Sequence, residues 1–147
     1  MGNIKERMVA DTNEKGKVRY VRYKHVLEQY NKAMESGFYL EAVTLMESII
    51  SDRLESRAAY LEKTNGFETL GKLCNILSSD DILKDIIPQV VEWKNGRNKV
   101  LHEMSKIDNT NVNESFDSKY NSAKQLGECG LDIFRKIDSI ITKSKKS

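Results

Sequence analysis

The chain has 147 residues, a net charge of +2 at pH 7, 39% hydrophobic residues and 31% charged residues. This length suffices for one domain with a buried core, and the composition excludes a disordered or fibrous protein. No apolar run approaches the roughly 18 residues of a transmembrane helix, so a membrane span is not expected. Because the charge is nearly balanced, any surface that binds nucleic acid has to be local.

The long segments without glycine or proline favour helix, because the chain has one proline and eight glycines. Apolar residues recur at helical spacing over residues 17–36, 38–63, 67–77, 88–105 and 115–141, and a short turn of helix is expected at 82–87. Gly37 is expected to end the first helix, and residues 107–113 to form a loop. These elements predict an all-α fold, an up-and-down bundle of four to five helices without a β-sheet.

The predicted domain organisation is a flexible leader over residues 1–16, a single helical domain over 17–142 and a basic tail over 143–147. Ile49 and Leu131 lie on the apolar stripes and are expected to be nearly inaccessible to solvent. Cys74 and Cys129 have no close partner spacing, which indicates neither a zinc site nor a disulfide framework. Two isolated cysteines in a chain without a signal peptide predict a cytoplasmic protein, and no metal or cofactor is expected.

One stretch, residues 93–104, combines an arginine, an amide and a histidine inside a predicted helix: Arg97, Asn98 and His102. At about 100° per residue, Asn98 and His102 lie about 40° apart on one face, whereas Arg97 lies about 140° from His102. This arrangement suits a cleft between two packed surfaces better than one flat face. A guanidinium grips phosphate oxygens through a planar fork, and an imidazole moves protons near neutral pH.

The pattern of Arg97, a polar Asn98, three variable positions and His102 resembles the motif of HEPN domains, small helical proteins that are often metal-independent ribonucleases. The strict match covers these six positions, and the all-helical layout extends the resemblance loosely over most of the chain. A branch of HEPN toxins has a tyrosine two places after the histidine. Here that position is Met104, so the chain departs from that branch.

The resemblance implies a metal-independent endoribonuclease of a defence or toxin-type system, in which the 2′-hydroxyl of RNA attacks the adjacent phosphorus. His102 would act as general base or acid, and Arg97 would neutralise charge in the transition state. Asn98 would orient the ring or hold a phosphate oxygen. The implied partners are RNA, a second copy of the chain in a homodimer with two motifs facing one cleft, and an antitoxin or defence-system protein.

Structural interpretations of the motif stay open at this point. His102 fits equally a partly buried histidine whose ring is satisfied, and Arg97 fits a surface ion pair. Trp93 fits either stacking on Arg97 or the core. Gly96 indicates either close approach of another backbone or an RNA phosphate, or a tolerated helix glycine. If the motif has only a structural role, the protein would be a non-catalytic helical dimerisation or adaptor module.

A second set of residues lies in the first predicted helix, where the cations Arg19, Arg22 and Lys24 alternate with Tyr20 and Tyr23. This pattern fits a small nucleic-acid-binding regulator, in which cations hold phosphates and rings stack on bases, and it fits ordinary amphipathicity equally well. Three further residues are weighed for the motif site. They are His25, for which a solvated face is the favoured interpretation, and Glu47 and Asp52, which are placed to orient Arg97 or His102.

Overall fold

The computed structural model describes residues 15–103 and 116–146, and this part of the chain is all-helical, with five helices and no strand. The predicted all-α fold is therefore confirmed. The helices are α2 (Gly16–Ser36), α3 (Tyr39–Tyr60), α4 (Leu70–Leu77), α5 (Ile87–Glu103) and α6 (Phe116–Lys146). Most of the predicted leader and all of the predicted loop at 107–113 lie outside the described residues.

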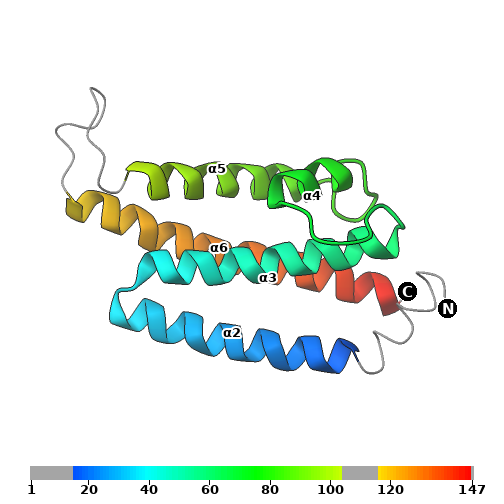
Figure 1. The fold of residues 1–147 in the computed structure, drawn as a ribbon, viewed down its shortest axis with the longest axis horizontal. Helices are drawn as coiled ribbons and strands as arrows, with labels where there is room; N and C mark the ends of the chain where they lie inside the picture. The colour runs from blue at the N-terminus through cyan, green and yellow to red at the C-terminus, as the bar shows by residue number, and fades with distance from the viewer. Residues whose placement is uncertain (1–14, 104–115, 147) are drawn as a thin grey trace.

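Four long helices run alternately in opposite directions and form the bundle (Figure 1). Helices α3 and α6 make the most extensive contact and occupy its middle, with α2 on one side and α5 on the other (Figure 1). The short α4 packs against both α3 and α5. The ends of α2 and α5 and the starts of α3 and α6 therefore meet at one end of the bundle (Figure 1).

The turn between α2 and α3 is set by Gly37, which ends α2 as predicted. Its φ of 79° lies in the left-handed region, where a glycine has no Cβ to clash. The amide of Gly37 donates to the carbonyl of Met34 at 3.3 Å and that of Phe38 to the carbonyl of Ala33 at 2.8 Å. These bonds close the last turn of α2 and reverse the chain into α3.

The segment around α4 differs from the sequence-based expectation. Helix α4 begins at Leu70 rather than at 67, because the Thr69 hydroxyl caps it by accepting from the Lys72 amide at 3.2 Å. Residues 81–86 form successive turns rather than a short helix. The Asp80 carboxylate, just before these turns, accepts two hydrogen bonds from Arg57, at 3.0 and 2.9 Å.

The core joins all five helices. Its largest fully buried side chains are Val43, Met46, Ile50, Leu54, Leu73, Cys74, Leu77, Leu83, Val90, Ile137 and Ile141. Ile49 is buried as predicted, but Leu131 is only half-buried, so its predicted burial is wrong. Helix α6 continues to Lys146, so residues 143–146 of the predicted basic tail are helical. None of the described helices is both long enough and apolar enough to cross a membrane.

Candidate functional site

Helix α5, which carries the motif, is fixed tightly against α6. Trp93 is 3% exposed, and its indole nitrogen donates to the carbonyl of Leu126 at 2.9 Å. A Cβ on Gly96 would lie 3.2 Å from Leu126 Cδ1, and one on Gly130 would lie 2.9 Å from Trp93 Cζ2. Trp93 is thus a core residue, and Gly96 serves close packing of α5 on α6. These contacts of Trp93 and Gly96 with α6 hold the start of the motif in place.

Arg97 joins α5 to α3 through an ion pair. One terminal nitrogen of its guanidinium lies 2.5 Å from Glu47 Oε1, and the two side chains are 21% and 25% exposed. The buried Nε of Arg97 has no hydrogen-bond partner within the described residues. Glu47 therefore orients Arg97, one of the two roles weighed for it from the sequence. The carboxylates Glu92 and Glu103 on the same helix form no such pair with Arg97 in the described part of the chain.

His102 lies in the last described turn of α5 and is exposed to solvent, and Asn98 is half-buried. Within the described ranges, no hydrogen bond or ion pair restrains the imidazole ring. This exposure excludes the interpretation of His102 as a buried histidine with a satisfied ring. The end of α5 is itself held in place, because the Lys119 ammonium on α6 donates to the carbonyl of Glu103.

The structure does not bring the guanidinium of Arg97 and the imidazole of His102 of one chain together. Arg97 extends toward Glu47 on α3, whereas His102 is exposed at the end of the bundle where α5 ends (Figure 1). This divergence follows from the angle of about 140° between positions five residues apart on a helix. A substrate that contacts both groups has to lie across the end of α5, or a second molecule has to complete the site.

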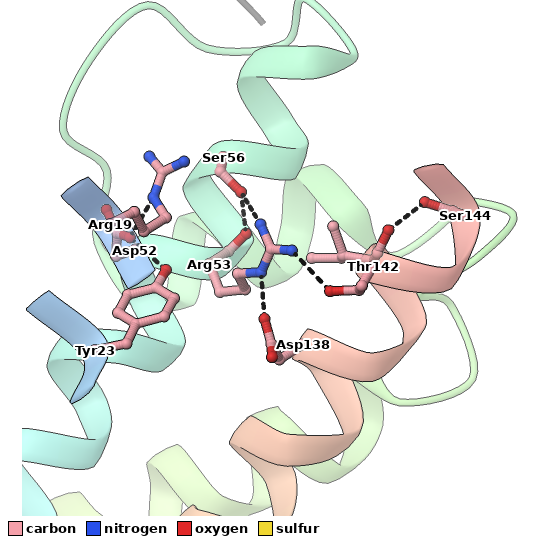
Figure 2. A network of polar contacts seen from close by, with 9 residues as sticks. Arg19, Tyr23, Asp52, Arg53, Ser56, Asp138, Thr142 and Ser144 are labelled. Carbon is pink, nitrogen blue, oxygen red and sulfur yellow. Dashed lines mark hydrogen bonds and ion pairs between the residues drawn. The ribbon is translucent and has the colours of Figure 1, made fainter. Parts of the chain in front are cut away.

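The other two residues considered for this site lie elsewhere. His25 is on α2 with its side chain 74% exposed, and its Nδ1 lies 3.9 Å from Glu28, as expected for a solvated face. Asp52 accepts hydrogen bonds from Arg19 Nε at 2.9 Å and from the Tyr23 hydroxyl (Figure 2). Asp52 therefore ties α3 to α2 and does not orient Arg97 or His102.

An ion pair between a buried arginine and a partly exposed aspartate, next to Asp52, was not predicted from the sequence. Arg53 has only 7% of its side chain exposed, and its guanidinium donates to three groups: Asp138 Oδ1 at 2.9 Å, Ser56 Oγ at 3.2 Å and Thr142 Oγ1 at 3.4 Å (Figure 2). The sequence contained a signal for this pair. Arg53 follows Ile49 by four positions and Ile50 by three, so it occupies the apolar stripe of α3, where an unpaired charge is not tolerated.

Tyr23 is the α2 residue that packs beside these polar contacts. Its ring packs edge-on against Phe134 of α6, with the ring centroids 5.3 Å apart. Burial, followed by the hydrogen bond to the Asp52 carboxylate, raises the pKa of the Tyr23 hydroxyl far above its ordinary value. The hydroxyl therefore stays protonated and remains a hydrogen-bond donor. Arg19 and Tyr23 thus serve, at least in part, to attach α2 to the bundle.

Two hollows flank this part of α2. One, of about 470 Å³, lies between α2 and α3 and is lined by Lys15, Arg22 and Asp52 among others. The other, of about 760 Å³, lies between α2 and α6 and is lined by Lys17, Tyr20, Arg53 and Lys145 among others. Neither includes a residue of the motif on α5.

Within residues 15–103 and 116–146, no group of three or more His, Cys, Asp and Glu side chains is placed to hold a metal ion. Cys74 is buried and Cys129 is exposed, and both are free thiols. Burial raises the pKa of the Cys74 thiol, which keeps it protonated in the core. A comparison of the chain with protein-family models, curated proteins and solved structures found no match.

Proposed function

We propose that the protein is a metal-independent endoribonuclease of the HEPN type, with Arg97 and His102 acting at a site shared by two copies of the chain. The proposal is supported by the different settings of the two side chains. Arg97 is held by Glu47 at the junction of α3 and α5, while His102 is exposed at the end of α5 and unrestrained in the described residues. One group is positioned to bind charge, and the other is accessible to a substrate.

The proposed reaction is an internal displacement on RNA. The 2′-hydroxyl loses its proton and attacks the adjacent phosphorus, the bond from phosphorus to the 5′-oxygen breaks, and that oxygen gains a proton. The products are a 2′,3′-cyclic phosphate and a 5′-hydroxyl. Because the nucleophile belongs to the substrate, it is already close to the phosphorus, and the protein has to supply proton transfer and charge stabilisation.

Proton balance favours two copies of the motif. The reaction removes one proton and delivers another, whereas each chain contributes one imidazole, His102, at the end of α5. Two chains that meet at this end supply one ring as base and one as acid, with each Arg97 fork facing the phosphoryl oxygens. The divergent directions of Arg97 and His102 within one chain fit a site of this kind. Asn98, one turn before His102 on the same face, would hold a ring or a phosphate oxygen.

Glu47 has a defined part in this proposal. By accepting from one terminal nitrogen of Arg97, it fixes the plane of the guanidinium before substrate binds. Because the Nε of Arg97 is buried, the donors proposed to contact phosphate are those of the terminal nitrogens that are not bonded to Glu47. Glu47 is thus a positioning residue, which acts through Arg97. The setting in a defence or toxin-type system, with an antitoxin or similar partner protein, is proposed on the HEPN resemblance alone.

Mixing the parent protein with an inactive variant tests the shared site. His102→Ala is expected to be inactive, and a heterodimer of parent and variant holds only one of the two imidazoles that the reaction uses. When the two proteins are mixed and allowed to exchange subunits, we expect cleavage to fall with the square of the parental fraction, and sedimentation to show a dimer at micromolar concentration. A monomer at high concentration, or cleavage that falls only in proportion to the parental fraction, would contradict a shared site.

One observation favours a second candidate function. The ion pair between Arg97 and Glu47 also ties α5 to α3, so it explains Arg97 as a structural residue of a non-catalytic dimerisation or adaptor module. That candidate predicts that Glu47→Gln and Arg97→Ala lower stability to a similar degree. It also predicts that the parent protein cuts no RNA, which separates the two functions.

A further inference from the structure

The groove between α2 and α6 lies at the opposite end of the bundle from the motif, near the start of α2 and the end of α6 (Figure 1). Its volume is about 760 Å³, and its lining includes Lys17 and Tyr20 from α2 and Lys145 from α6. Arg53 and Asp138, which form an ion pair with each other, also line it (Figure 2). This groove has no part in the reaction proposed for the motif.

Cations predominate among the described residues that line the groove. These cations are Lys17, Arg19, Arg53 and Lys145, and the described lining contains one carboxylate, Asp138. Arg19 is bonded to Asp52 and Arg53 to Asp138. An excess of cations in the lining is what a local polyanion site requires.

The aromatic residues of this region divide into two kinds. Tyr23 is bonded to Asp52 and packed on Phe134, so its ring belongs to the fold. Tyr20 is 71% exposed although it lines the groove, so much of its ring is open to solvent. Lys17, three residues before it on α2, is exposed too. An exposed ring beside a cation at helical spacing offers a stacking surface next to a phosphate contact.

We propose that this groove binds single-stranded RNA, with a base stacked on Tyr20 and the neighbouring phosphates held by Lys17 and Lys145. An acidic protein surface would use the cations equally well, but the carboxylates that pair with them do not stack on a tyrosine ring. A nucleotide strand uses both, because each unit carries a phosphate and a planar base. The tyrosine and cation pattern of the first helix would then have both explanations. Amphipathicity accounts for the residues that pack against the bundle, and nucleic-acid binding accounts for the exposed residues of the groove.

Fluorescence anisotropy tests this proposal independently of catalysis. The probe is a fluorescein-labelled, single-stranded 2′-O-methyl oligonucleotide of about 12 nucleotides, within the usual range of site sizes. Such a strand has no free 2′-hydroxyl, so it cannot be cut by the proposed reaction. We expect the parent protein and His25→Ala to bind it equally well, because His25 belongs to neither the motif nor the groove. Failure of the proposed nuclease activity would therefore leave this test intact.

Substitutions at two exposed positions test the proposal. Tyr20→Ala is expected to weaken binding by roughly 5- to 150-fold, the loss of one stacked base, and Tyr20→Phe to restore it. Lys17→Gln is expected to reduce the slope of log affinity against log salt concentration by about 0.7, the loss of one phosphate contact. Lys32→Gln is the matched control, because Lys32 is an exposed lysine near the other end of α2. It should leave both affinity and slope unchanged.

Three results would overturn the proposal. The parent protein does not bind the strand, or Tyr20→Ala binds it as tightly as the parent, or Lys17→Gln changes the salt dependence no more than Lys32→Gln does. If the groove accepts a protein instead, the second and third results are expected. Circular dichroism of each variant should match the parent, because Lys17, Tyr20 and Lys32 are all exposed.

Discussion

Replacing His102 by alanine is expected to lower the rate of RNA cleavage by about 10²–10⁴-fold, the usual contribution of a positioned acid or base. The imidazole is the group proposed to move the proton, and it is exposed at the end of α5 without packing in the core. The variant should therefore keep the helical content and oligomeric state of the parent. The measurement is the single-turnover cleavage rate of a labelled RNA, with circular dichroism and sedimentation of the same samples.

The other histidine of the chain provides the matched control. His25 is exposed on α2 and belongs to neither the motif nor the groove, so His25→Ala should cleave at the parental rate. Arg97→Lys should impair cleavage, because a point charge does not replace a planar fork. Equal rates for His102→Ala and His25→Ala would remove His102 from the reaction, and no cleavage by the parent protein would leave the adaptor function in its place.

Replacing Asp80 by alanine is expected to lower the free energy of unfolding by about 3–5 kcal/mol, because it leaves a largely buried cation unpaired. Asp80 accepts two hydrogen bonds from Arg57, and the side chains are 3% and 13% exposed. The pair also fixes the turns between α4 and α5, and thus the start of the motif helix. Urea denaturation followed by circular dichroism measures the change.

The next residue in the chain is the control for this prediction. Asp81 is exposed, so Asp81→Ala should change the free energy of unfolding by no more than about 0.5 kcal/mol. Adding Arg57→Leu to Asp80→Ala should restore part of the lost stability, since the double variant no longer buries an unpaired charge. If Asp80→Ala and Asp81→Ala unfold at the same urea concentration, the buried pair is not a stabilising element.

The helices could be predicted from the sequence where periodicity and a strong stop signal coincide. The first was expected over 17–36 and spans Gly16–Ser36, because a regular apolar stripe ends at Gly37. The segment between α3 and α5 was less predictable, because its polar groups have alternative partners. Asp80 could cap a helix or bind a distant cation, and only the packing of α3 beside it gives it Arg57. The Thr69 cap was overlooked, although threonine is a common capping residue.

The candidate site, like the helices, could be predicted from the sequence only in part. The motif on α5 could be identified from the sequence, whereas Glu47 and Asp52 were equal candidates to orient it, and only the structure shows that Glu47 pairs with Arg97. Their spacing argues against Asp52 as a second partner, because Glu47 and Asp52 are five residues apart and lie about 140° apart around α3. The structure accordingly places Asp52 toward α2. The groove beside Tyr20 depends on how the end of α6 lies against α2, which no local pattern encodes.

The most direct test of the proposed nuclease compares two labelled RNAs that differ at one position. Both are incubated with the purified parent protein and EDTA, and one has a 2′-deoxynucleotide on the 5′ side of the cleaved bond. We predict that the all-ribose strand is cut to a 2′,3′-cyclic phosphate and a 5′-hydroxyl, and that the substituted bond stays intact. No cleavage of either strand, or equal cleavage of both, would contradict the proposed 2′-hydroxyl attack at Arg97 and His102.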